Sequence, residues 1–334
     1  MSLLNRQFQL AQRPVGPATR ETFSYVETPV GEPGPGQVLV ENLYLSLDPA
    51  MRGWMNDARS YIAPVAIGEV MRALGVGKVV ASQHPDYQVG EHLCGVVGVQ
   101  DYFLGEPRDF HKVDPGQAPL PLYLSALGMT GMTAYFALLD VGQPKAGETV
   151  VISGAAGAVG SVAGQIARIR GCRVVGIAGG ADKCRYLVDE LGFDGAIDYK
   201  AEDLHAALKR ECPKGVDVYF DNVGGDILDA VLTRINRKAR IVICGAISQY
   251  NNKEAVKGPA NYLALLVNRA RMEGMVVFDY APRFGEAVKD IAGWLASGEL
   301  KSKEDVVTGL GTFPETLGRL FSGENFGKLV LKVR

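Results

Sequence analysis

The feature that most constrains this chain is a glycine-rich segment from Glu148 to Ser161, with the sequence ETVVISGAAGAVGS. A short apolar stretch at 149–153 has the pattern of a buried strand, and the glycines that follow it lead into an amphipathic stretch at 159–170. A second apolar stretch follows at 173–178. This succession predicts a strand–helix–strand unit, in which the glycine turn opens the helix.

The turn resembles the GxGxxG fingerprint of dinucleotide-binding proteins, with Ala155, Gly157 and Gly160 at the three glycine positions and an extra Gly154 before them. Gly157 allows the backbone to approach the phosphates, and Gly160 allows the helix to pack closely on the strand. The unpaired N–H groups at the start of the helix attract the pyrophosphate. The pattern therefore predicts a dinucleotide site, against the alternative of a glycine turn without a ligand.

The end of the second strand indicates which dinucleotide is bound. An NAD site places Asp or Glu there, whereas this chain has Gly179 and Gly180, followed by Lys183 and Arg185. The carboxylate of Asp182 would repel a phosphate, but as an N-cap it would point at its own helix. The missing acid and the nearby cations favour NADP, although such cations are often merely solvated helix residues.

The rest of the chain predicts two domains. Residues 1 to about 120 are rich in Pro and Gly with short β-branched runs, which is typical of a small, mostly antiparallel β domain. From residue 148 strands alternate with helical stretches, and this rhythm predicts a doubly wound parallel sheet, so the fold class is α/β. We expect domains at 1–125 and 126–300, with 301–334 returning to the first. The expected strands are 149–153, 173–178, 194–198, 216–221, 240–244, 274–279 and, at the end of the chain, 328–332.

Composition and charge restrict the remaining possibilities. A net charge of −2 gives no basic excess that would indicate a nucleic acid partner. The five cysteines are scattered, which favours a reducing cytoplasm, and the four histidines form no metal-ligand cluster. The uncharged stretch 117–139 is long enough to cross a bilayer, but prolines and small polar residues favour a buried helix over 123–139. Residues 1–14 lack the apolar segment of a signal peptide.

Several blocks in the same order resemble the medium-chain dehydrogenase/reductase superfamily over the whole chain. The similarity is greatest to its zinc-independent, NADPH-dependent alkenal, prostaglandin and curcumin reductases. The blocks are PGPGQVLVENLYLSLDPAMRGWM (33–55), LGMTGMTAYFALLDVGQPKAGETVVISGAAGAVGS (127–161), FDNVGG (220–225), CGAISQYN (244–251), NYLALLVNRARMEGMVVFDY (261–280) and GENFGK (323–328).

The resemblance implies a GroES-like β domain built from both chain ends, with a Rossmann domain between them. It also implies Lys183 and Tyr199 at the adenosine 2′-phosphate, and Asn222 and Asn325 near the ribose, pyrophosphate or nicotinamide. Zinc-dependent members carry ligands that are missing from 67–80 here, so we expect no metal. Ala50 replaces a tyrosine that several alkenal reductases have in their DPYMR-like motif.

Together, the motifs and the resemblance give the expected cofactor contacts. Asn222 and Cys244 follow the fourth and fifth strands, where ligands of open α/β sheets bind, although Asn222 is equally explained as a turn residue and Cys244 as a buried filler. The expected contacts are Ala155, Gly157, Ala158, Val159, Gly160, Gly179, Lys183, Tyr199, Asn222, Cys244, Phe278 and Asn325.

Hydride transfer between an alcohol and a ketone needs a group that stabilises an alkoxide, and zinc usually supplies it. Without zinc, reduction of a carbon–carbon double bond conjugated to a carbonyl is easier to catalyse. NADPH delivers hydride to the β carbon, and a hydroxyl donor suffices for the enolate oxygen. Candidate donors are Tyr250 and Tyr262, besides the ribose hydroxyl of the cofactor. The alternatives are a zinc-free quinone reductase and a non-catalytic NADP-binding sensor.

The last expected strand also predicts the assembly. Met275 to Phe278, with the sequence MVVF, would form an apolar edge of the sheet, and such edges are normally covered or paired. Pairing with a second copy across a two-fold axis predicts a homodimer held by residues 261–280, which the resemblance also implies.

Overall fold

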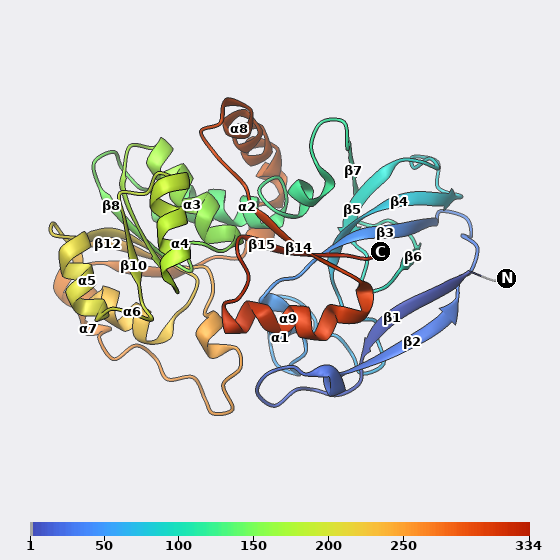
Figure 1. The fold of residues 1–334 in the computed structure, drawn as a ribbon, viewed down its shortest axis with the longest axis horizontal. Coiled ribbons are helices and arrows are strands. Elements are labelled where there is room, and N and C mark those ends of the chain that lie inside the picture. The colour runs from blue at the N-terminus through green and yellow to red at the C-terminus, as the bar shows by residue number, and fades with distance from the viewer. Residues whose placement is uncertain (1–2) are drawn as a thin grey trace. The chain divides into compact units, whose positions relative to one another are not determined.

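The computed structural model describes residues 3–334, which divide into two compact units. Unit 1 contains the described residues up to 124 together with 304–334, and unit 2 contains 125–303 (Figure 1). Both ends of the chain therefore belong to the same unit.

Unit 2 is built on a six-stranded sheet in the order β10-β9-β8-β11-β12-β13, with every neighbouring pair parallel. This order confirms the predicted doubly wound sheet, because the chain starts in the middle and winds outward in both directions. The strands are β8 (Thr149–Ser153), β9 (Arg173–Ala178), β10 (Gly195–Asp198), β11 (Val216–Asp221), β12 (Ile235–Ile243) and β13 (Arg271–Gly274).

Helices cover this sheet because its strands are apolar on both faces. Val151, Val175 and Ile241 join one buried cluster with apolar residues of the α5 and α6 helices. The α3 helix packs against β8 and β9. The helices are α2 (Met129–Phe136), α3 (Ala158–Ile169), α4 (Ala181–Arg185), α5 (Leu204–Glu211), α6 (Gly225–Leu232), α7 (Leu263–Asn268) and α8 (Phe284–Ser297).

The sixth strand is not where the sequence predicted it. β13 spans Arg271–Gly274 and pairs with 240–243 of β12, whereas the apolar run MVVF at 275–278 follows it and passes into a 3-10 helix at Val277–Arg283. An edge strand has a neighbour on one side only, so its residues need not be apolar, and the apolar run that follows gave the stronger pattern.

The helix predicted over 123–139 begins later in the structure than the sequence indicated. Leu120–Leu124 is a separate 3-10 turn, α2 begins at Met129, and a π-helical turn at Ala137–Gly142 extends it. The carbonyl of Ser125 accepts hydrogen bonds from the N–H groups of Gly128 and Gly131, and this turn interrupts the helix.

Unit 1 contains a seven-stranded sheet in the order β14-β15-β3-β4-β5-β7, with β6 paired to β3, and a separate antiparallel pair of β1 and β2. Antiparallel pairs dominate, and β14 with β15 is parallel. The elements are β1 (Leu4–Leu10), β2 (Phe23–Pro29), β3 (Val38–Ser46), α1 (Ala50–Trp54), β4 (Leu74–Ser82), β5 (His92–Val96), β6 (Tyr102–Gly105), β7 (His111–Val113), β14 (Glu304–Thr308), α9 (Phe313–Ser322) and β15 (Lys328–Lys332).

The motif LDPAMR after β3 is held by buried polar contacts within unit 1. The Lys328 ammonium, 2% exposed, donates to the carbonyl of Leu47 at 2.7 Å and to the Asp48 carboxylate at 2.9 Å. The Arg52 guanidinium donates to the carbonyls of Pro14 and Gly16 at 3.0 and 2.9 Å. Asp48 and Arg52 therefore connect the segment after β3 to the start of β15 and to the loop between β1 and β2.

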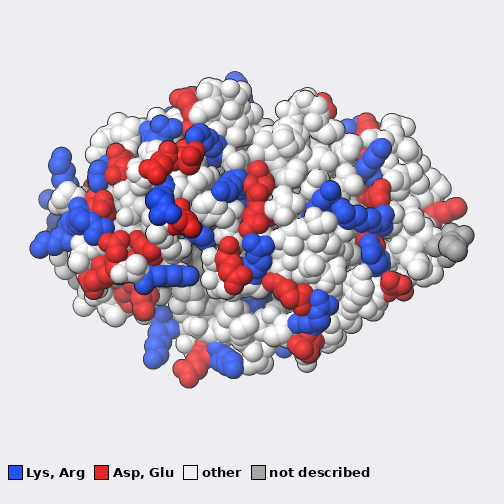
Figure 2. All heavy atoms as spheres, in the orientation of Figure 1, with Lys and Arg blue, Asp and Glu red and all other residues white. Residues whose placement is uncertain are grey.

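Charges of both signs are interspersed on the face of the molecule in Figure 2, without a large area of one sign. Within residues 3–334 we find no helix that is long and apolar enough to cross a membrane.

Candidate functional site

The glycine turn after β8 has the geometry of a phosphate-binding loop. The left-handed residue of the turn is Gly154, with φ of +58°, so Ala155 is tolerated at the first fingerprint position because the turn does not need a glycine there. A Cβ on Gly160 would lie 2.4 Å from the Gly154 carbonyl oxygen, so only glycine allows α3 to begin this close to the strand.

The start of α3 leaves N–H groups open for an anion. Gly157 caps the helix with no side-chain hydrogen bond, and no acidic residue occurs in the first turn. Within the described part of the chain, no acceptor engages the N–H groups of Ala158, Val159 and Gly160. Three open donors at the positive end of a 12-residue helix fit a pyrophosphate.

Asn222 lies beside this turn, at the carboxyl end of the neighbouring strand β11. Its Cβ is 3.4 Å from the position that a Cβ on Gly154 would take. The backbone N–H of Asn222 donates to Ser153 Oγ at 2.9 Å, and its Nδ2 donates to the Ser153 carbonyl at 2.8 Å. Ser153 thus fixes the orientation of a side chain that we expect to contact the cofactor.

A buried carboxylate completes this connection between β8 and β11. Asp221 Oδ1 accepts hydrogen bonds from the hydroxyls of Ser153 and Tyr219, both at 2.8 Å, and from two backbone N–H groups of the following loop, at Val223 and Gly224. Burial and the adjacent carboxylate raise the pKa of Tyr219 well above its usual value. Sequence reasoning missed Ser153 and Asp221, although both occur at strand ends within the matched motifs.

Cys244 and Tyr250 follow β12, the next strand of the sheet. The Cys244 N–H donates to the Asp221 carbonyl at 2.9 Å, and burial raises the pKa of its thiol to about 12, so it is no nucleophile at neutral pH. The Tyr250 hydroxyl accepts from the Ala246 N–H at 3.1 Å and lies 3.2 Å from where a Cβ on Gly245 would be. Tyr250 is thereby held at the same edge of the sheet as Asn222.

Gly179 and Gly180 directly follow β9 and form a bend, called here the glycine corner, at which a 2′-phosphate is expected. A Cβ on Gly179 would lie 3.0 Å from the Tyr199 ring and 2.9 Å from Cε of Lys200, so both side chains fold back over this glycine. Lys183 lies three residues beyond the adjoining Gly180, in α4, and is half-buried. Sequence reasoning missed Lys200, and its position directly after Tyr199 is the signal that could have indicated it.

The structure describes Tyr262 and Phe278 elsewhere in unit 2. Tyr262 is the N-cap of α7 and is 59% exposed, and Phe278 lies in the 3-10 helix after β13 and is 44% exposed. Asn325 belongs to unit 1, in the loop before β15, where its Nδ2 donates to the Gly327 carbonyl at 3.1 Å. The roles of these three residues at the site therefore stay predictions.

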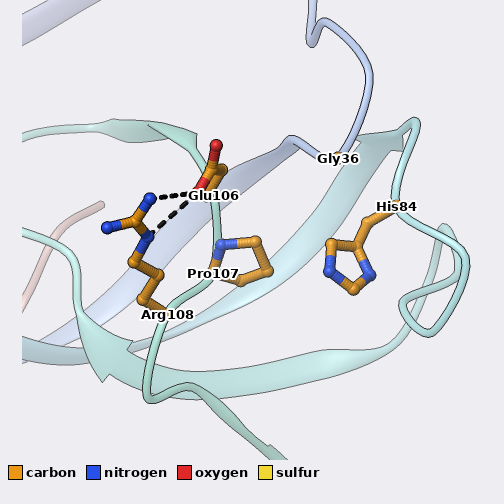
Figure 3. A pocket seen from close by; sticks show the side chains of 5 residues that line it. All are labelled: Gly36, His84, Glu106, Pro107 and Arg108. Atoms are coloured by element: carbon orange, nitrogen blue, oxygen red, sulfur yellow. Dashed lines mark hydrogen bonds and ion pairs between the residues drawn. The ribbon is translucent and has the colours of Figure 1, made fainter.

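The described residues contain no cluster of metal ligands, and a pocket on unit 1 is formed by other residues than those expected at the site. Between residues 3 and 334 no group of three His, Cys, Asp or Glu side chains converges as a metal site. A pocket on unit 1 is lined by Gly36, His84, Glu106, Pro107 and Arg108 (Figure 3). Its Glu106 and Arg108 side chains are hydrogen-bonded to each other at 2.9 and 2.7 Å, and none of the expected site residues lines it.

The parallel sheet, its glycine turn and the open helix N-terminus together define a dinucleotide-binding domain of the Rossmann type. Residues 6–113 match the family model described as the N-terminal domain of oxidoreductase, and residues 158–293 match the model described as zinc-binding dehydrogenase.

Individual relatives are similar over the full length. The chain is 47% identical to the putative NADP-dependent oxidoreductase YfmJ of Bacillus subtilis, covering 100% of this chain and 99% of that one. It is 44% identical to the NADPH-dependent curcumin reductase of Escherichia coli, covering 98% and 97%. The crystal structure of CurA from Vibrio vulnificus in complex with NADPH is 44% identical, with a TM-score of 0.94 over 98% of this chain and 99% of that one. The chain therefore belongs to the medium-chain dehydrogenase/reductase superfamily, in the group that contains the alkenal and curcumin reductases.

Proposed function

We propose that this protein uses NADPH to reduce the carbon–carbon double bond of α,β-unsaturated aldehydes or ketones. The observation that carries the proposal is its full-length similarity to a curcumin reductase, since curcumin has double bonds conjugated to carbonyl groups. The NADPH-bound structure of a relative that is 44% identical supports the choice of cofactor.

The residues of unit 2 fit this cofactor. The N–H groups of Ala158, Val159 and Gly160 would hold the pyrophosphate, with Ala155 and Gly157 shaping the turn. Lys183, Tyr199 and Gly179 would hold the 2′-phosphate, and Asn222 and Cys244 would contact the ribose or nicotinamide. Phe278 and Asn325 remain proposed contacts on the strength of the resemblance.

When bound, the cofactor supplies a hydride to the β carbon of the substrate. The chain must then stabilise negative charge on the carbonyl oxygen, and a hydroxyl donor does so without a metal. Tyr250 is the better candidate, because its hydroxyl is held beside Gly245 at the ligand-binding edge of the sheet. Tyr262 is the second candidate. The proton for the α carbon can come from solvent, so no general acid is required.

Zinc takes no part in this proposed reaction. A catalytic zinc site needs three protein ligands. Residues 67–80 supply no His or Cys where the zinc-dependent relatives have ligands, and this supports a reaction without zinc. Reduction of a conjugated double bond also needs less stabilisation of negative charge than alcohol oxidation does, because the developing charge is delocalised.

The decisive experiment is consumption of NADPH with a panel of 2-alkenals, enones and quinones. We expect turnover of the alkenals and enones, with mass spectrometry identifying the saturated carbonyl as product. Turnover of quinones alone would indicate a quinone reductase instead. Tight NADPH binding with no turnover on any acceptor would indicate a non-catalytic NADP-binding sensor.

We further propose a homodimer formed along the β13 edge of unit 2. The four residues of β13 are partly or fully exposed. Beside them in sequence, the α7 side chains of Leu263, Leu266 and Val267 are 56%, 75% and 67% exposed. An open strand edge together with an exposed apolar helix face is suited to a second copy of the same sheet.

The proposed domain organisation and location follow the sequence expectations. Residues 1–125 and 301–334 would form the substrate domain and 126–300 the NADP-binding domain. A cytoplasmic location is supported by five cysteines that are all free thiols.

A further inference from the structure

Lys200 has an unusual conformation for an exposed lysine. Its Cε lies 2.9 Å from the position that a Cβ on Gly179 would take, so the aliphatic chain lies over the glycine corner instead of extending away from the surface. The Tyr199 ring lies over the same glycine, at 3.0 Å. Two neighbouring side chains at the end of β10 thus cover the end of β9.

Asp198 fixes this arrangement through the backbone. Its Oδ1 accepts hydrogen bonds from the Gly180 N–H at 2.9 Å and from the Lys200 N–H at 3.1 Å. One carboxylate oxygen therefore connects the loop after β9 to the loop after β10. The two loops keep their relative position without any contact to the Lys200 ammonium.

The cations around the corner differ in what they bind. The Arg185 guanidinium is paired with Asp182 in the same helix, so the sequence expectation that Arg185 adds a cation for the phosphate is weakened. Across residues 3–334, no ion pair or hydrogen bond engages the Lys200 ammonium. The nearby acid Glu202 is paired with Arg210 at 2.7 Å. Lys200 is thus an uncommitted cation held against the glycine corner.

We infer that Lys200 is a second cation for the adenosine 2′-phosphate, acting with Lys183, and that it contributes to the choice of NADPH over NADH. A phosphate monoester carries a charge of about −1.5 to −2 at pH 7, which one ammonium group does not neutralise. The inference rests on the proposed use of NADPH and is independent of which carbonyl compound is reduced.

Binding of two adenosine nucleotides tests the inference without any hydride transfer. 2′,5′-ADP carries the 2′-phosphate, and 5′-AMP lacks it and is otherwise identical. For Lys200→Ala we expect the dissociation constant of 2′,5′-ADP, measured by calorimetry, to rise about tenfold, and that of 5′-AMP to change less than about twofold. The rise should shrink in high salt, because an exposed charge pair is screened.

Two further variants serve as controls. Lys200→Arg keeps the charge and should retain most of the affinity for 2′,5′-ADP. Lys209→Ala removes an exposed lysine from the nearby helix α5 and should leave both nucleotides unaffected.

The outcomes separate this inference from the proposed function. An unchanged affinity of Lys200→Ala for 2′,5′-ADP, or an equal loss with both nucleotides, would overturn the role of Lys200 while leaving the use of NADPH intact. A wild-type protein that does not prefer 2′,5′-ADP to 5′-AMP would overturn the use of NADPH and the role of Lys200 together.

Discussion

At the scale of single residues, Lys183 and Arg185 show how two cations of one short helix can differ in their surroundings. Both lie in α4, but the Arg185 guanidinium is paired with Asp182 on the exposed side of the helix. Lys183 is half-buried and lies closer in sequence to the glycine corner. Because Arg185 already has an ion-pair partner, we expect Lys183 to make the stronger contact to a phosphate.

Replacing Lys183 with Ala should raise the Michaelis constant for NADPH and leave that for NADH almost unchanged. A charge-assisted contact to phosphate contributes about 1.5–3 kcal/mol, which corresponds to at least a tenfold change. Steady-state kinetics with both cofactors measure the difference, and Arg185→Ala is the matched control, for which we expect little change. A similar loss with both cofactors would show that Lys183 supports the fold instead.

The buried thiol of Cys94 predicts that the protein becomes less stable in alkali. Burial raises the pKa of this thiol from 9.0 to about 12, so the folded state keeps the proton that the unfolded state releases. Its contribution to stability is complete below pH 9 and is lost between pH 9 and pH 12. At pH 10 the loss is on the order of 1 kcal/mol.

Urea unfolding at pH 7 and pH 10 measures this loss. The Cys94→Ala variant should lose less stability between the two values, because it lacks the titrating group. Equal losses in the variant and the wild type would contradict the assignment to Cys94.

The candidate site could be predicted in part, because part of it is local in sequence. The turn around Gly154 is a continuous segment, so its pattern identifies it. Ser153 and Asp221 lie on β8 and β11, which are far apart in sequence and are connected by hydrogen bonds at their ends. Those contacts depend on the order of the strands in the sheet, and no local pattern records them.

At the scale of elements, the approach of α3 to β8 depends on Gly160. We expect Gly160→Ala to destabilise the protein by about 1–3 kcal/mol and to weaken NADPH binding, because its Cβ would lie 2.4 Å from a backbone oxygen that cannot move away cheaply. Thermal unfolding and cofactor titration measure both effects.

Gly293 provides the control for this substitution. It lies in the middle of α8, and a Cβ there would meet nothing within 4 Å. Gly293→Ala should therefore stabilise the protein by about 0.4–1 kcal/mol, because alanine restricts the unfolded chain. Equal effects of the two substitutions would show that α3 does not require the close approach.

Three strands inside the sheet of unit 2 have the bounds that the sequence predicted. β8, β9 and β11 have the expected bounds because each lies inside the sheet and must be apolar. The expected sixth strand was wrong because β13 is an edge strand with exposed residues. Burial, which produces the apolar pattern, is weakest at the edge.

At the scale of the whole molecule, the proposed dimer depends on the exposed apolar face of α7. We expect the wild type to sediment as a dimer at micromolar concentration, and Leu266→Lys to shift it toward the monomer, because burying an unpaired ammonium is costly. Leu266 is 75% exposed, so the substitution should not unfold the isolated chain. A wild type that sediments as a monomer would rule out the dimer.

The pairing of β15 with β3 has a consequence for how the protein is made. Residues 44–46 of β3 are synthesised before unit 2, but their partners at 330–332 are synthesised after it. All six strands of unit 2 emerge in between, so its sheet can be completed first. Until residues 330–332 emerge, positions 44–46 of β3 lack this partner and can pair with another chain. A ribosome that stops after residue 303 would release a protein with a complete nucleotide-binding sheet and an exposed strand beside it.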